Sequence, residues 1–246
     1  MTNQLQLYVQ QENIRFPEVF DVIAIILFAL TGVLAAMRRG YDVIGVFIMA
    51  LVVSAGGGLI RDGLFLQDGP PALTRNWRFL PAVLAACVIG WLVDRWIVRF
   101  HKVIAVLDAV GLSAFSMVGL TKSLEAGLSA PAAILVGVVN AAGGGLLRDV
   151  LTREEPLLFK PGQFYVLASL AGCVLFVGLA YRAVMAPRHA ELVSMATIFV
   201  LRILAIIFNW RTSPMQPWFG SADSSQESTS SHPPSIDRER DHERGR

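Results

Sequence analysis

Long apolar runs separated by short polar segments fill most of this chain. About 20 largely apolar residues are enough for one helix to cross the hydrocarbon core of a bilayer. Runs of this kind lie at 19–37, 43–66, 79–97, 103–120, 132–151, 164–183 and 192–209. Glycine, proline and charged residues mark the short connections between them, as in turns. The pattern therefore predicts an all-α integral membrane protein with seven transmembrane helices.

Composition supports the membrane class. The chain is 54% hydrophobic and 16% charged, and its mean hydropathy of +0.55 lies outside the usual range of soluble domains. A formal net charge of +2 is too small and too scattered to predict a nucleic-acid partner, so we expect membrane lipid as the surroundings. Both cysteines lie in apolar runs without metal-ligand spacing, and we expect neither a metal site nor another cofactor.

Two further features concern the ends of the chain. The segment 211–246 is rich in serine, proline and charge, which predicts a disordered tail without an assigned role. Basic residues near the span ends are slightly more numerous on the side that would hold the C-terminus. Under the positive-inside rule this predicts a protein of the cell inner (plasma) membrane with its N-terminus outside and its C-terminus inside.

One motif occurs twice. The stretch AGGGLIRD at 55–62 returns as AGGGLLRD at 142–149, 87 residues later. An ungapped alignment of 21–65 with 108–152 matches 13 of 45 positions, which indicates two copies of one structural unit. Each copy contains three predicted spans, so the second must cross the membrane in the opposite direction. We expect an N-terminal segment at 1–18, a three-helix repeat at 19–104, an inverted three-helix repeat at 105–190, a seventh transmembrane helix at 191–210 and the tail.

The glycine triplets predict breaks in the second and fifth helices. Glycine inside a helix is about 1 kcal/mol less favourable than alanine, and irregular backbone at membrane depth is tolerated only against protein or a water-filled cavity. Inverted repeats with interrupted helices often place a solute or ion path between the two copies. We therefore expect kinked helices around a permeation pathway. Close helix packing through small residues is the alternative.

Charged residues follow both triplets. Buried charges inside a span need a partner, and inverted symmetry would allow Arg61 to pair with Asp149 and Arg148 with Asp62. Contacts to backbone carbonyls freed at the helix breaks would serve equally. In the alternative interpretation all four side chains reach the head groups.

Three other charged residues lie in apolar surroundings. Asp21 and Asp108 occupy equivalent repeat positions near predicted helix starts, where an aspartate often caps the helix, and carboxylates at a cation entrance would look the same. Arg202 lies at the middle of the seventh span and is expected to face the bundle, as a fixed countercharge or a gate element.

With these paired motifs, predicted spans and chain length, the sequence resembles the prokaryotic branch of the trimeric intracellular cation (TRIC) channel family, also known as a glycine-transporter-type family. The resemblance covers about residues 18–210. It implies a homotrimer with a pore in each subunit around kinked helices two and five, permeable to K⁺ or Na⁺. The implied pore residues are Gly56, Gly57, Gly58, Arg61, Asp62, Gly143, Gly144, Gly145, Arg148 and Asp149. Animal members have basic residues that respond to lipid and voltage, and Lys122 is the candidate counterpart.

Other functions compete with a cation channel. A secondary transporter of glycine or another small amino acid would use the same inverted repeat. A retinal-type receptor would need a lysine in the last span, where Arg202 stands. A hydrolase would need a base beside a serine, but His101 and His189 lie at span ends. We therefore expect no enzymatic activity.

Overall fold

The computed structural model describes residues 2–10, 18–67, 69–93, 100–159, 164–182, 185–208 and 210. All regular structure in this part of the chain is helical. The helices are α1 (Thr2–Gln10), α2 (Glu18–Arg38), α3 (Val43–Ile60), the π-helix η1 (Arg61–Leu66), α4 (Ala72–Arg75), α5 (Phe79–Val93), α6 (Phe100–Glu125), α7 (Ala130–Leu151), α8 (Tyr165–Tyr181) and α9 (Pro187–Ile207). Each of the seven predicted spans overlaps one of the longer helices.

Several of these helices have the length and apolar character of membrane spans. Within the described residues, four segments are long enough and apolar enough to cross a bilayer: Val43–Leu66, Val103–Glu125, Ala130–Leu151 and Pro187–Ile207. Three apolar helices are shorter, at Val22–Arg38, Phe79–Val93 and Tyr165–Tyr181. The tail predicted to be disordered, residues 211–246, lies outside the described residues.

The helix bounds recur with the spacing of the sequence repeat. Shifted by 87 residues, α3 with η1 falls on α7, and α5 falls on α8, with ends that agree within about two residues. The turns also correspond, because Gly40 and Gly127 have positive φ values of 71° and 87° that other residues rarely adopt. Asp42 then caps α3 by accepting a hydrogen bond of 2.8 Å from the Gly45 N–H.

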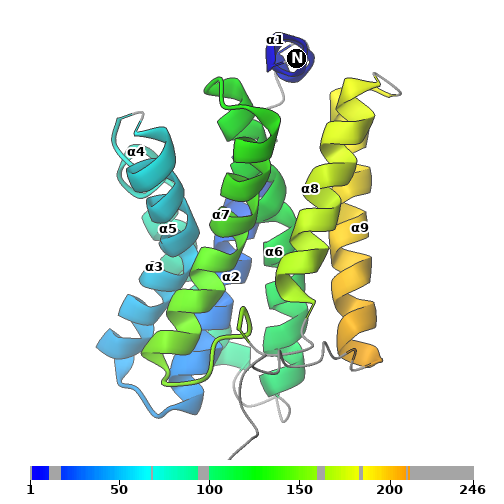
Figure 1. Ribbon diagram of the computed structural model, residues 1–246. Helices are drawn as coiled ribbons and strands as arrows, with labels where there is room; N and C mark the ends of the chain where they lie inside the picture. Colours follow the sequence, from blue (N-terminus) through cyan, green and yellow to red (C-terminus); the bar gives the residue numbers. More distant parts are fainter. Residues whose placement is uncertain are drawn as a thin grey trace, which may run out of the picture. The chain divides into compact units, whose positions relative to one another are not determined.

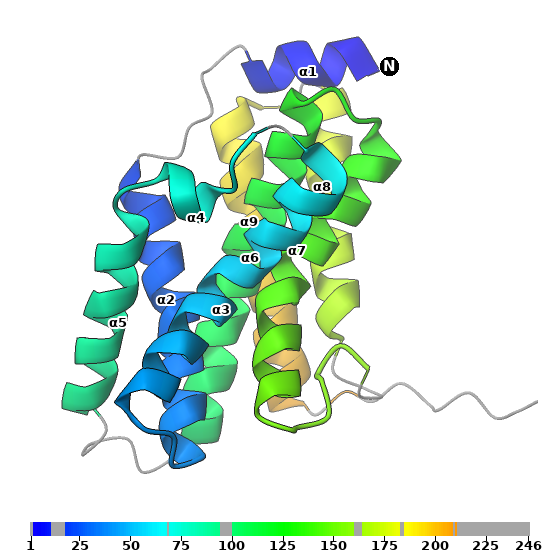
Figure 2. The same ribbon diagram turned by 90° about the vertical axis from the view of Figure 1, so that its left-hand side faces the viewer.

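The helices form two groups, each with its own buried core. Val33, Ala50 and Val83 belong to a buried cluster of α2, α3 and α5. A second cluster includes Leu112 and Cys173 and joins α6, α7, α8 and α9. The two groups meet along α2 with α6 and along α3 with α7, and Figure 2 shows α3 running obliquely past α6 and α7.

The N-terminal helix α1 was not predicted. It lies across one end of the longer helices (Figure 1) and packs on α6 and α8. Leu5 and Val9 are buried in the second core cluster, and the Tyr8 hydroxyl donates a 2.6 Å hydrogen bond to the Met185 carbonyl. The sequence of α1 mixes polar and apolar residues and contains no apolar run of membrane length. The hydrophobic pattern therefore did not predict this helix.

Candidate functional site

The two glycine triplets meet where α3 crosses α7. A Cβ on Gly57 would overlap the carbonyl oxygen of Asn140, and a Cβ on Gly143 would lie 2.9 Å from the Gly57 Cα. A Cβ on Gly56 would likewise overlap Leu147. Glycine at these positions lets two backbones touch, as at other small-residue helix crossings.

The predicted helix breaks at the triplets are therefore wrong. α7 is continuous from Ala130 to Leu151 through the second triplet, and α3 stays helical through the first. Close packing against the other helix offsets the low helix propensity of glycine, so the backbone hydrogen bonds need not be given up. The departure from α-helical geometry comes after the first triplet, in the π-helix Arg61–Leu66, and has no counterpart in α7.

Arg61 opens this π-helix and is only 2% exposed. Its Nε donates a 2.7 Å hydrogen bond to the Asp62 carboxylate, and its Nη1 donates a 3.3 Å bond to the side-chain oxygen of Asn140. The Asn140 amide nitrogen in turn donates to the Phe115 carbonyl at 2.6 Å. The first charged pair is thus held by a residue of α7 and, through it, by α6.

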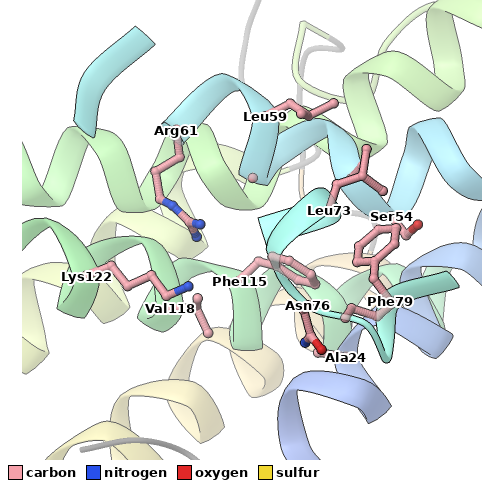
Figure 3. A pocket seen from close by; sticks show the side chains of 13 residues that line it. Ala24, Ser54, Leu59, Arg61, Leu73, Asn76, Phe79, Phe115, Val118 and Lys122 are labelled. Atoms are coloured by element: carbon pink, nitrogen blue, oxygen red, sulfur yellow. The ribbon is translucent and has the colours of Figure 1, made fainter. Parts of the chain in front are cut away.

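A cavity of about 60 Å³ lies beside Arg61. Figure 3 shows Arg61, Lys122, Asn76 and the rings of two phenylalanines around it. Its described lining comes from α2 to α6: Ala24, Ile25, Ser54, Ala55, Gly58, Leu59, Arg61, Leu73, Asn76, Phe79, Phe115, Val118 and Lys122. The volume is enough for a few water molecules or one small solute.

The second charged pair belongs to a larger buried cluster. Arg148 Nη1 donates a 2.8 Å bond to Asp108, and Arg148 Nε donates a 2.9 Å bond to Asp149. Asp149 also accepts a 2.9 Å bond from the Leu157 N–H. The Arg202 guanidinium lies 4.8 Å from the centre of the Tyr165 ring. Two arginines and two aspartates share this cluster, so their formal charges balance.

The predicted reciprocal pairing of the two motifs is wrong. Each arginine bonds the aspartate that follows it, not the aspartate of the other motif. The physical reason is that α3 and α7 run in opposite directions from their crossing, so the two motifs lie on opposite sides of it. Arginine is long enough to turn back to its neighbour, and residues of other helices supply the second contact. Both arginines and Asp149 are buried, which also contradicts the head-group alternative for them.

The four remaining predicted site residues do not form a single cluster. Asp108 is fully buried within α6 and bonds Arg148, so its interpretation as a helix cap is wrong. Asp21 belongs to the first turn of α2, but its side chain lies outside the described part. Arg202 faces the interior of the bundle, as predicted. Lys122 lines the cavity with Arg61.

Two aromatic rings are in contact beside the cavity. Phe115 lines the cavity, and its ring centre lies 4.8 Å from that of Phe28. A Cβ on Gly111 or Gly144 would overlap the Phe28 ring, so these glycines form a notch that holds it. Phe28 and Phe115 are equivalent repeat positions, which places this contact between the two helix groups.

Sequence reasoning missed Asn140 and Tyr165. Asn140 joins Arg61 to α6, and Tyr165 contacts Arg202. An amide within a predicted apolar span was an available signal for Asn140, because a buried amide needs hydrogen-bond partners. No comparable signal marked Tyr165, since tyrosine is common near the ends of membrane helices.

Comparison with known proteins gives sequence relatives along both helix groups. The profile of the family described as "Glycine transporter" matches two stretches, 18–95 and 105–181. The UPF0126 membrane protein YvgT of Bacillus subtilis is 32% identical over 79% of this chain and 94% of its own length. The UPF0126 inner membrane protein YadS of Escherichia coli K12 is 30% identical over 76% of this chain and 89% of its own length.

Solved structures have the same fold. The TRIC trimeric intracellular cation channel orthologue from Rhodobacter sphaeroides superposes with a TM-score of 0.73 at 30% identity, covering 78% of this chain and 97% of that one. Another TRIC cation channel gives 0.72 at 26% identity, covering 84% and 100%. The chain therefore belongs to the glycine-transporter (UPF0126) family of integral membrane proteins and has the fold of prokaryotic TRIC channels.

Proposed function

We propose that this protein is a channel for monovalent cations, K⁺ above all. The observation that carries the proposal is the match to solved TRIC cation channels along more than three quarters of the chain at 30% identity. By the same relation we propose a homotrimer with one pore in each subunit. The seven helices would cross the membrane as two inverted repeats of three and a final helix.

The proposed pathway runs through the cavity beside Arg61 and past the crossing of α3 and α7. Gly58 and Arg61 of the first motif line that cavity, which supports their assignment to the pathway. Gly57 and Gly143 are in backbone contact, so the conformation described here would be closed at the crossing. The Arg148 cluster would then stand on the far side of the closure, with Asp108 and Arg202 near that mouth.

We assign the gate to Phe28 and Phe115. Apolar constrictions close channels by excluding water. Phe115 lines the cavity, and the Phe28 ring beside it fills the notch formed by Gly111 and Gly144. Rotation of either ring, or a shift of α3 along α7, would connect the cavity to the other side. This gate is formed by equivalent residues of the two repeats.

A transporter of glycine or another small amino acid is the second candidate. The description of the matched family profile favours it, and the cavity has room for a small solute. Such a protein would expose the cavity to each side of the membrane in turn by rocking one helix group against the other.

Reconstitution separates the two functions. The purified protein is placed in planar bilayers under a KCl gradient, and in liposomes supplied with radiolabelled glycine. A channel gives unitary currents that reverse near the K⁺ equilibrium potential. Saturable glycine uptake without unitary currents would instead identify a transporter, and would overturn the channel proposal.

A further inference from the structure

The exposed face of α5 consists of apolar side chains. The helix sequence, FLPAVLAACVIGWLV at Phe79–Val93, contains no charged residue. Its other face packs on α2 and α3, with Ala86 and Gly90 buried, and Figure 2 shows α5 at the edge of the helix bundle. A helix that is apolar on every side requires an apolar partner for the face that its own chain leaves open. The large exposed side chains are Leu80, Leu84, Val88, Ile89, Trp91 and Leu92.

The distribution of large and small residues on α5 favours lipid over a second protein subunit as this partner. Helices in membranes associate through small residues, which let their backbones approach closely. On α5 the small residues Ala82, Ala86 and Gly90 are on the packed side, where a Cβ on Gly90 would overlap Val33 of α2. Leucine, isoleucine, valine and tryptophan make up the large side chains of the open side. Flexible acyl chains can cover such side chains without a close-fitting surface.

Exposed tryptophans lie near both ends of this face. Trp77, just before α5, is 78% exposed, and Trp91, in the last turn of α5, is 69% exposed. The Arg78 guanidinium lies 5.3 Å from the centre of the Trp77 ring, in a cation–π contact. Tryptophan is enriched at both membrane–water interfaces, so two rings in these positions mark where the hydrocarbon would begin and end.

The apolar length between these ends is short. The 15 residues of α5, at a rise of about 1.5 Å each, give an apolar length of about 22 Å. The hydrocarbon core of a typical bilayer is about 30 Å thick. Arg78 precedes the apolar stretch, and Asp94 and Arg95 follow it, so charged residues bound it at both ends. A stretch shorter than the hydrocarbon thickness can be accommodated by local thinning of the bilayer.

We propose that the open face of α5 is a lipid-contacting surface of short apolar length, which prefers short acyl chains and thins thicker bilayers around it. Its partner is the acyl region of phospholipids, not a second copy of this chain. In the proposed homotrimer this face lies on the outside. The inference requires no ion flux, so it stands or fails independently of the channel proposal.

Fluorescence quenching by brominated phosphatidylcholine tests the lipid contact. Two proteins are reconstituted in liposomes, each with Trp77 or Trp91 as its single tryptophan and the other four replaced by phenylalanine. Bromine on acyl carbons nearest the head group should quench both rings more strongly than bromine near the chain end. Phe79→Trp, in a protein without other tryptophans, is the matched control, because Phe79 is buried on the packed face at the Trp77 end of α5. Its fluorescence should be quenched far less.

Competition measures the preferred chain length. Phosphatidylcholines with monounsaturated chains of fourteen to twenty-two carbons compete with a brominated lipid for contact with Trp77 or Trp91. We expect the highest affinity for the shortest chains and a decrease of roughly threefold or more to the longest, as a result of hydrophobic mismatch. Arg78→Leu lengthens the apolar stretch and should move the highest affinity towards longer chains. Arg188→Leu, at an exposed position in the first turn of α9, should not, because α9 already has membrane length.

Two kinds of result would overturn the proposal. Absence of quenching at both Trp77 and Trp91 would show that another subunit covers this face. Stronger quenching by bromine near the chain ends, or equal affinity for all chain lengths, would show that the apolar surface is not short. Gel filtration recognises a misfolded Arg78→Leu protein, and the quenching depth and chain-length series of the two single-tryptophan proteins then decide.

Discussion

Neighbouring glycines of one triplet meet different surroundings. Gly57 lies against the backbone of Asn140, where a Cβ would overlap the carbonyl oxygen. Outside its own helix backbone, a Cβ on Gly58 would have Arg61 Nη2 as its one neighbour among the described residues, at 4.0 Å. These two glycines of one triplet therefore have different physical roles. Gly57 permits the crossing of α3 and α7, and Gly58 leaves room at the cavity wall.

Gly57→Ala should lower the free energy of unfolding by about 1–3 kcal/mol, the usual range for overpacking. Gly58→Ala should leave stability unchanged or raise it by up to about 1 kcal/mol, because alanine favours the helix. Thermal unfolding of the purified variants, followed by gel filtration, checks both. A tolerated Gly57→Ala would contradict the tight crossing.

Removal of the Phe28 ring tests the proposed gate. Phe28→Ala should increase the open fraction in planar bilayers, because the alanine no longer fills the notch between Gly111 and Gly144. Phe176→Ala is the control, since Phe176 is a fully buried phenylalanine of α8 in the second core cluster. Both changes should reduce stability by about 3–5 kcal/mol, and only the first should alter gating. Equal currents in both variants would refute the gate assignment.

At the scale of elements, ion pairs join helices that are distant in sequence. Asp108 of α6 and Arg148 of α7 are both buried and bonded at 2.8 Å. Arg38 of α2 pairs at 3.2 Å with Glu154, which follows α7, and both of these side chains are about one third exposed. The two ion pairs have similar N–O distances but differ in burial. Burial decides how much each pair contributes to stability.

Asp108→Asn should lower the free energy of unfolding by about 3–5 kcal/mol, because it leaves an uncompensated charge in a buried cluster. Glu154→Gln should change it by less than about 1 kcal/mol, as for exposed ion pairs. Thermal unfolding measures the stability change in both variants. Added salt should alter only the effect of Glu154→Gln. Similar losses of unfolding free energy in the two variants would argue that the Arg148 cluster is not sealed from water.

At the scale of the whole molecule, the repeat predicts opposite orientations for equivalent turns. Arg39, between α2 and α3, and Ala126, between α6 and α7, are exposed residues 87 positions apart. In a background without Cys87 and Cys173, Arg39→Cys and Ala126→Cys should react with a membrane-impermeant maleimide from opposite sides of the membrane. Labelling is compared in intact cells and in inverted vesicles. Reaction of both from one side would contradict the inverted repeat.

Much of the fold followed from the hydrophobic pattern. The apolar runs predicted seven helices with ends that agree within about five residues, and four described segments are long enough and apolar enough to cross a bilayer. A membrane-spanning helix needs continuous apolar sequence whatever its neighbours are. The paired motifs also led to the candidate site. The pattern did not predict α1, which depends on α6 and α8 for the burial of Leu5 and Val9.

The partners of the charged residues came only from the tertiary structure. Sequence determined that charges follow each glycine triplet within apolar helices and so require compensation. It did not determine that Asn140 would meet Arg61 or that Asp108 would meet Arg148, because those contacts depend on how helices cross. The same crossing decides that the triplets remain helical, since backbone contact at Gly57 and Gly143 stabilises a geometry that glycine alone does not favour.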